Sequence, residues 1–172
     1  MAQVEAGDRN QWNVEGRPVT NDPTDIRNFL RLSKNITTSG RLQPGDPQRL
    51  AAIGTARVIN LALADHPEAL PNAQQEMAGA GLTYLHLPVP FVEPAEAHYK
   101  ALVAALEAAQ TPVHVHCIMN WRVSAFLYRY HREACGMAEP EARSWLEKIW
   151  SPHTSDTEEA APWRAFVERV ED

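Results

Sequence analysis

The chain has 172 residues, of which 44% are hydrophobic and 22% charged, a composition typical of one globular domain with its own core. Its net charge of −6 argues against nucleic acid as the main partner, and no apolar run approaches the roughly 18 residues that a membrane-spanning helix needs. Two cysteines are too few for a disulfide framework, and the polar N-terminus shows no secretory signal, so we expect a cytoplasmic, reducing location and no membrane.

The first half of the chain is expected to open with an irregular arm and then to alternate between helices and strands. Residues 1–24 are polar and rich in turn formers, which favours an arm there and a single domain over 25–172. Thr24 or Asp25 can cap a helix that runs through Leu32. The expected elements that follow are a strand at 36–39, a helix at 44–54, a strand at 57–61 and a helix at 72–80.

The second half continues the alternation and then adds helices. The expected elements are a strand at 82–87, a helix at 94–110, a strand at 112–116, and helices at 122–135, 139–150 and 160–170. This order predicts an α/β fold with a mostly parallel central sheet flanked by helices, and with extra C-terminal helices. Ligands of such sheets bind beyond the carboxyl ends of the strands. The stretch that follows residue 116 occupies that place.

That stretch contains the most informative residues of the sequence. Cys117 ends an apolar strand, and Arg122 follows after four intervening residues, at the expected start of a helix. The first amides of a helix have no partners within the helix, and the helix dipole adds partial positive charge there. A thiol in this field ionises easily, and a guanidinium matches the oxygens of phosphate or sulfate. We therefore interpret Cys117 as a nucleophile facing an anion held by Arg122, although a cysteine at a strand end is often only a small buried residue.

The sequence around this pair resembles a known family. The Val-His-Val-His-Cys run that ends at Cys117, together with Arg122, is similar to the active-site signature of the cysteine-dependent protein phosphatases. Residues 81–89 resemble the preceding strand and loop of the dual-specificity phosphatases. Two further segments, 35–42 and 58–61, resemble the opening of a bacterial phosphatase-like family of unknown function. The resemblance covers about residues 28–135 and implies a dual-specificity-phosphatase-like fold.

The resemblance also implies a mechanism. Cys117 would attack phosphorus and form a cysteinyl-phosphate that water hydrolyses, while Arg122 and the backbone amides of the loop hold the phosphoryl oxygens. His116 would orient the loop. The loop residues that would bind the anion are Ile118, Met119, Asn120, Trp121 and Arg122. The expected ligand is a phosphorylated small molecule or a phosphoprotein, with phosphate or sulfate in the site and with no cofactor and no metal.

Three features depart from the phosphatase pattern. The loop between Cys117 and Arg122 is one residue shorter than usual and has the spacing of rhodanese-type sulfurtransferases, whose loop carries a persulfide. The hydroxyl that usually follows the arginine comes one position later, at Ser124. The loop after residue 87 has no Asp as general acid, and Glu93 is the candidate that remains there, with capping of the next helix as its alternative role.

Other polar residues are weaker candidates for the same site. Asp65 and its neighbour His66 follow the strand at 57–61, so they lie on the edge of the sheet where ligands bind, and they could touch the substrate or supply an acid. Ser39 and Arg41 would line the pocket by analogy with the family.

Two histidine and cysteine pairs have spacings that a metal site can use. His114 and His116 fall on one face of a strand beside Cys117, while His131 and Cys135 are four residues apart on a helix. No further ligand with suitable spacing completes either set. Core packing and surface exposure explain these residues more simply than a metal ion does.

Three functions stay open on the sequence alone. The first is a cysteine-dependent phosphatase that hydrolyses phosphomonoesters through Cys117. The second is a sulfurtransferase that passes sulfur through a Cys117 persulfide, as the four-residue spacing suggests. The third is a phospho-ligand-binding module without catalysis, which the missing Asp and the displaced hydroxyl favour.

Overall fold

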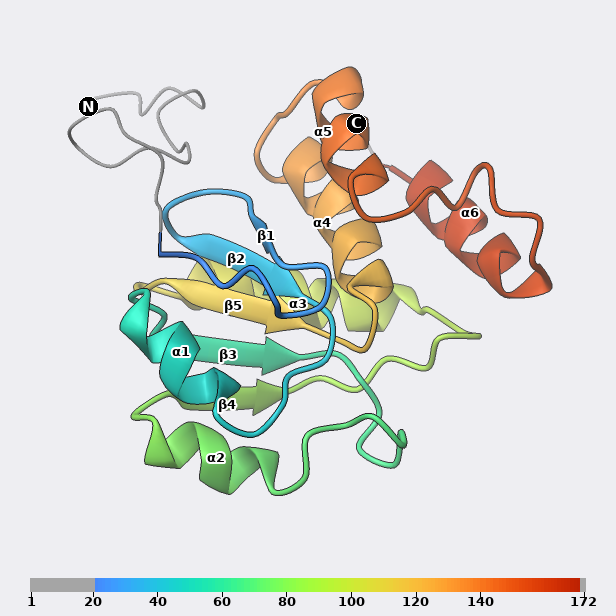
Figure 1. Ribbon diagram of the computed structural model, residues 1–172. Coiled ribbons are helices and arrows are strands. Elements are labelled where there is room, and N and C mark those ends of the chain that lie inside the picture. Colours follow the sequence, from blue (N-terminus) through green and yellow to red (C-terminus); the bar gives the residue numbers. More distant parts are fainter. Residues whose placement is uncertain (1–20, 171–172) are drawn as a thin grey trace, which may run out of the picture.

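A five-stranded sheet forms the centre of the computed structural model, which describes residues 21–170 (Figure 1). The strand order is β1-β2-β5-β3-β4, with β1 antiparallel to β2 and the other neighbours parallel. The strands are β1 (Leu30–Arg31), β2 (Ile36–Ser39), β3 (Arg57–Asn60), β4 (Thr83–His86) and β5 (Val113–His116). The predicted α/β fold with a mostly parallel sheet is therefore confirmed.

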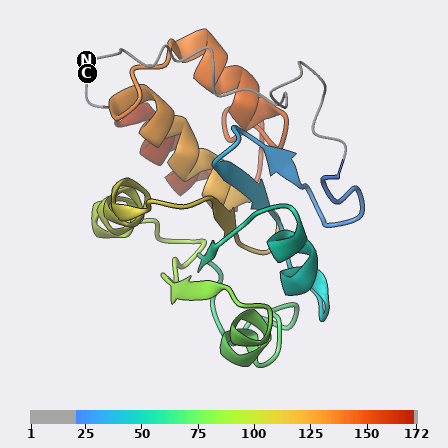
Figure 2. The ribbon, with the colours of Figure 1, turned by 90° about the vertical axis from the view of Figure 1, so that its left-hand side faces the viewer.

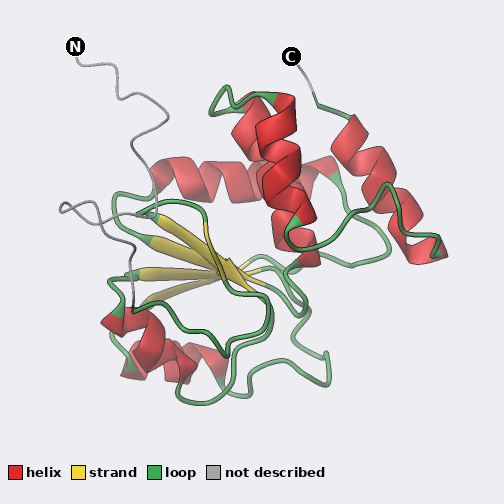
Figure 3. Ribbon diagram, turned by 45° about the horizontal axis from the view of Figure 1, so that its top comes forward, coloured by secondary structure: helices red, strands yellow, loops and turns green. Residues whose placement is uncertain are grey.

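Helices cover both faces of this sheet. They are α1 (Asp46–Ala52), α2 (Ala73–Gly79), α3 (Glu96–Ala108), α4 (Trp121–Glu133), α5 (Glu139–Glu147) and α6 (Ala161–Glu168), with a short 3-10 turn, η2 (Glu158–Ala160), directly before α6. Figures 2 and 3 show α1 and α2 on one face of the sheet and α3 to α6 on the other. No helix within residues 21–170 is long and apolar enough to cross a membrane.

The central strand β5 is buried on both faces because it lies between two other strands and two layers of helices. Val113 and Val115 pack into the larger core, together with side chains of α3, α4 and α6. His114 and His116 point to the opposite face, as alternation along a strand requires, and are also buried. The smaller core on that face joins Val58 of β3 to residues of α1 and α2. The loop that follows β5 therefore starts in the middle of the sheet edge.

One predicted element is wrong. The segment expected as a helix from Thr24 or Asp25 through Leu32 forms turns and then the short strand β1. Asn28 has a φ of 49°, a left-handed conformation that ends a right-handed helix. The carbonyl of Arg27 accepts a hydrogen bond from the Gly40 amide at 2.7 Å, so its backbone is committed to another segment. Most of the expected arm, 1–20, lies outside the described residues.

Candidate active site

The Cys117 loop leaves the sheet between its two neighbours β2 and β3. The amide of Cys117 donates to the carbonyl of Ser39 at 3.3 Å, and the amide of Leu61 donates to the carbonyl of His116 at 2.8 Å. Cys117 is buried, and α4 begins four residues later at Trp121. The strand, loop and helix N-terminus that the sequence predicted are therefore present, with Arg122 in the first turn of the helix.

Asn120 determines the shape of this loop. Its φ of 65° places it in the left-handed region directly before α4, where asparagine is tolerated better than most residues. Its Nδ2 donates to Thr38 Oγ1 at 3.0 Å and to the carbonyl of Asn28 at 2.8 Å. The side chain is fully buried, so it holds the loop from below.

Arg122 is buried but has an unusual partner. Its guanidinium carbon lies 5.3 Å from the centre of the Phe91 ring, which follows β4. The arginine makes no hydrogen bond and no ion pair with any residue in the described range 21–170, and its Nε is shielded from solvent. A buried guanidinium without a hydrogen-bonding partner is unfavourable unless a ligand supplies one.

A pocket of about 390 Å³ opens over this arginine. Four of the predicted loop residues line it: Ile118, Met119, Trp121 and Arg122. The opposite wall comes from Pro90–Val92 and from Leu63, with His66 and Glu159 as the polar side chains on that side. Val92 is 69% exposed and is the one large apolar side chain in 21–170 that stands out in solvent, so the rim of the pocket is apolar.

The two histidines of β5 are both uncharged at neutral pH. Burial lowers the pKa of His116 to about 4, and burial also lowers the pKa of His114 well below its usual range. The Ser39 hydroxyl donates its proton to the carbonyl of Gly40, so it accepts a hydrogen bond from Nε2 of His114 at 2.8 Å. The Nδ1 of the neutral ring then accepts from the Thr37 hydroxyl, also at 2.8 Å. His116 therefore places no positive charge beside Cys117, and its role as an orienting residue stays a prediction.

Ser39 and Arg41 lie under and beside the loop. The buried Ser39 hydroxyl donates to the carbonyl of Gly40 at 2.8 Å and does not line the pocket. The amide of Arg41 donates to the carbonyl of Ile118 at 2.9 Å, while its guanidinium pairs with Glu68 at 2.9 Å. A side chain at position 40 would come within 2.6 Å of that same carbonyl, so the segment is packed closely against the loop.

Cys117 and Asn120 are buried and are not among the residues that line the pocket, and Ser124, Glu93 and Asp65 do not line it either. The Ser124 hydroxyl donates to the carbonyl of Trp121 at 3.1 Å and faces a separate small cavity beside α5. Glu93 is exposed, and its amide donates to the carbonyl of Pro90 at 3.2 Å in a turn of the loop after β4. Asp65 is also exposed, whereas the next residue, His66, lines the pocket.

The structure adds residues that sequence reasoning did not select. Glu159 reaches the pocket from η2, and Phe91 supports Arg122 from the loop after β4. Neither residue has a local signal, because each contact joins segments far apart in the chain. The bidentate ion pair between Arg27 and Glu68, at 3.1 Å, also joins segments that are far apart in the chain. The Arg27 guanidinium lies 3.5 Å from the carbonyl of Ile118 in the Cys117 loop.

The described part of the chain has no group of three or more His, Cys, Asp or Glu side chains that could hold a metal ion. His131 and Cys135 lie at the end of α4, beside a cavity that Glu141 also lines. His114 has both ring nitrogens hydrogen-bonded to hydroxyl groups.

Comparison with known proteins gives the family. Residues 28–129, more than half of the chain, match the family "Beta-lactamase hydrolase-like protein, phosphatase-like domain". The chain belongs to this family. The resemblance to a cysteine-based phosphatase fold is thereby confirmed for this Beta-lactamase hydrolase-like phosphatase domain. No curated protein matches the chain.

Solved structures share the fold of this phosphatase-like domain. A DUF442 protein from Shewanella putrefaciens CN-32 is 24% identical, with 85% of this chain and 92% of that chain covered and a TM-score of 0.73. A variant of P. aeruginosa TpbA in complex with pTyr is 20% identical, with 84% of this chain and 85% of that chain covered and a TM-score of 0.65. The core catalytic domain of the PP-IP phosphatase SIW14 from S. cerevisiae, in complex with citrate, is 15% identical, with 86% of this chain and 87% of that chain covered and a TM-score of 0.68.

Proposed function

We propose that this phosphatase-like domain hydrolyses phosphomonoesters through a cysteinyl-phosphate on Cys117. The observation that carries the proposal is the state of Arg122, which lines the pocket beside the Cys117 loop and has no hydrogen-bonding partner within residues 21–170. The tetrahedral oxygens of a phosphoryl group match the fork of a guanidinium, so they are the natural partners for it. The pTyr held by the TpbA variant supports a phospho-ligand in this fold.

The proposed reaction has two steps. The Cys117 thiolate attacks phosphorus, so a P–S bond forms as the bond to the ester oxygen breaks, and the leaving oxygen departs as an anion that takes a proton from solvent where its basicity requires one. Arg122 and the amides at the start of α4 stabilise the negative charge that the phosphoryl oxygens carry. A water molecule then attacks phosphorus, gives up its proton and displaces the thiolate, which releases inorganic phosphate and restores Cys117.

The source of the leaving-group proton decides which esters react fastest. Glu93 is exposed outside the pocket, so we propose that it contributes little to the reaction. Esters whose leaving oxygen needs no protonation do not require a general acid. We therefore expect nitrophenyl phosphates to react faster than alkyl phosphates.

The test is phosphate release from p-nitrophenyl phosphate and from a panel of phosphopeptides and nucleotides. Turnover is expected with the natural sequence and is expected to vanish in Cys117→Ser. Cys135→Ser is the matched control, because Cys135 lies beyond the other end of α4 from the Cys117 loop. A complete lack of turnover across the panel would contradict the proposal.

Binding without turnover is the second candidate, because neither Glu93 nor Asp65 reaches the pocket. It predicts that phosphate binds, as measured by calorimetry, that Arg122→Ala abolishes the binding, and that no ester is hydrolysed. Sulfur transfer would give a third result. In that case thiosulfate treatment would add one sulfur atom to Cys117 in the intact mass, and Cys117→Ser would not gain it.

A further inference from the structure

Phe91 stands between Arg122 and the C-terminal part of the chain. The centre of its ring lies 5.3 Å from the guanidinium carbon of Arg122 and 5.5 Å from the centre of the Trp163 ring, which is stacked on it. The indole Nε1 of Trp163 also donates to the carbonyl of Phe91 at 2.7 Å. The same residue is therefore fixed through both its ring and its backbone.

An aromatic partner suits an arginine that must bind an anion. The five N–H donors of a guanidinium lie in its own plane, so an aromatic face stabilises the charge without occupying those donors. A carboxylate in the same place would occupy two donors and cancel the charge. The Phe91 ring therefore supports Arg122 and leaves its hydrogen-bonding capacity to a ligand.

The indole groups that fix this arrangement come from the region after α4. Trp163 lies on α6 and is fully buried. The Nε1 of Trp150 donates to the carbonyl of Trp121 at 3.1 Å. The rings of Trp150 and Trp121 are also stacked, with their centres 4.9 Å apart. Two tryptophans thus hold the loop after β4 and the first turn of α4, although the family match ends at residue 129.

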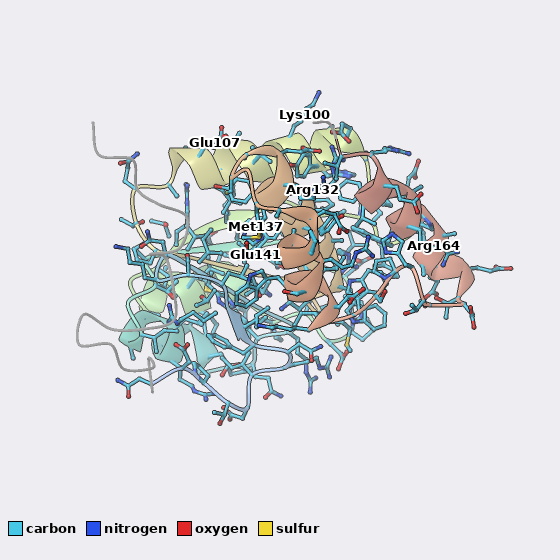
Figure 4. All side chains as sticks on the ribbon, turned by 90° about the horizontal axis from the view of Figure 1, so that it is seen from above. Lys100, Glu107, Arg132, Met137, Glu141 and Arg164 are labelled. Atoms are coloured by element: carbon cyan, nitrogen blue, oxygen red, sulfur yellow. The ribbon has the colours of Figure 1, made fainter. Side chains whose placement is uncertain are left out.

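The segment between α5 and α6 is itself tied to α6. Arg164, labelled in Figure 4, donates to the carbonyls of Pro152 and Ser155, at 3.2 Å and 2.6 Å. Behind Trp163, the rings of Phe126 and Phe166 join α4 to α6, with ring centres 4.8 Å apart. The support for Phe91 is therefore continuous with the main core.

We propose that Phe91 and Trp163 are positioning residues, which hold Arg122 with its N–H groups free to bind an oxyanion, so that α6 completes the site. The inference rests on the proposed function only for the kind of ligand, an oxyanion of phosphate type. It assigns a role in anion binding to residues that do not themselves contact the phosphoryl group.

The experiment measures the dissociation constant of inorganic phosphate by calorimetry with the full chain. Phe91→Leu removes the aromatic face and keeps an apolar side chain, so we expect phosphate to bind about tenfold more weakly. Phe91→Tyr keeps the face and should stay within about twofold of the natural sequence. Trp163→Phe keeps an aromatic ring but loses the Nε1 donor, and we expect a loss of about threefold to tenfold.

Val170→Ala is the control for damage to the C-terminal region. Val170 packs against the same core two residues after α6 and seven residues beyond Trp163, so this variant should unfold at a lower temperature yet bind phosphate normally while folded. Unchanged binding in Phe91→Leu would overturn the inference, as would an equal loss in Val170→Ala and Trp163→Phe. A chain that binds no phosphate would also overturn it, whereas a chain that binds phosphate without turnover would overturn only the hydrolase proposal.

Discussion

Asn28 and Asn120 join the Cys117 loop to the segment before β1 through two hydrogen bonds. Nδ2 of Asn120 donates to the carbonyl of Asn28 at 2.8 Å, and Nδ2 of Asn28 donates to the carbonyl of Met119 at 2.9 Å. Both asparagines have positive φ angles, 49° for Asn28 and 65° for Asn120. Two left-handed residues therefore fasten the loop to the segment that precedes β1.

Asn120→Ala should destabilise the fold and weaken catalysis together. The variant loses two hydrogen bonds and forces alanine into the left-handed region, so we expect the free energy of unfolding to fall by about 2 to 4 kcal/mol in a urea titration. Asn120→Gly keeps the backbone conformation and should lose about 1 kcal/mol less than alanine. Equal stability of the alanine variant and the natural sequence would contradict the structural role of Asn120.

Arg122→Lys should bind the phosphoryl group poorly although it keeps the charge. Lysine offers a point charge in place of a planar fork, and it fits the Phe91 face less well. We expect kcat/KM for p-nitrophenyl phosphate to fall about a hundredfold, which corresponds to the loss of one strong transition-state contact. Arg143→Lys on α5 is the control and should keep full activity. A lysine variant with undiminished kcat/KM would exclude bidentate binding by Arg122.

The buried His116 should make stability depend on pH. Its pKa in the folded chain is about 4, whereas an unfolded histidine titrates near ~6.5. Between these values only the unfolded chain binds the proton, so stability is fully present above the unfolded pKa and falls as the pH drops toward 4, by about 1.4 kcal/mol per pH unit at most. Urea titrations between about pH 5 and 7 should therefore show a shallower slope for His116→Gln. Parallel slopes would refute this origin of the pH dependence.

Arg129 should be the most sensitive buried charge. It is 1% exposed and pairs with Glu96 at 2.8 Å and with Glu133 at 2.9 Å, which joins α3 to α4. Arg129→Ala removes the buried guanidinium that both carboxylates share and should reduce the free energy of unfolding by about 2 to 4 kcal/mol. The matched control is Arg143→Ala, whose ion pair with Glu139 is partly exposed and should matter by less than about 1 kcal/mol. Comparable losses in the two alanine variants, measured by urea titration, would show that burial does not decide the effect.

His66 should contribute a hydrogen bond to the substrate. Its Nδ1 accepts from the amide of Glu68 at 3.0 Å, so in the neutral ring the proton lies on Nε2. His66→Asn keeps an acceptor for that amide but has no donor at the Nε2 position, and we expect kcat/KM to fall about tenfold. His66→Gln places an amide N–H near that position and should recover part of the loss. If glutamine and asparagine reduce kcat/KM equally, His66 does not donate to the substrate.

The regular elements of the fold could be predicted because their signals are local. Strand β5 and helix α4 follow from apolar alternation and helical spacing, and the bounds differ from those expected by two residues at most. The helix predicted at 24–32 is wrong because the conformation of this segment depends on residues far away in the chain. Asn28 takes a left-handed conformation while its side chain donates to the carbonyl of Met119, and a two-residue strand has no periodicity to detect.

The site could be predicted only as far as it is contiguous in sequence. Cys117 and Arg122 lie in one loop, and the helix that follows them gives their setting. The wall of the pocket is assembled from three other loops, so no spacing rule connects Phe91 or Glu159 to Arg122. Glu93 is predicted only from its place in the expected acid loop, and that place does not determine whether the side chain faces the pocket or solvent.

The family match ends at residue 129, within α4, whereas the tryptophans that pack behind the site lie beyond it. Two relatives with identical sequences in the Cys117 loop could thus still differ in their affinity for the ligand. Differences in substrate preference would then be caused by substitutions outside the loop, which a comparison of the loop sequences alone does not include. Under the proposal made for Phe91 and Trp163, the residues after α4 would adjust the strength of anion binding at a loop that lies earlier in the chain.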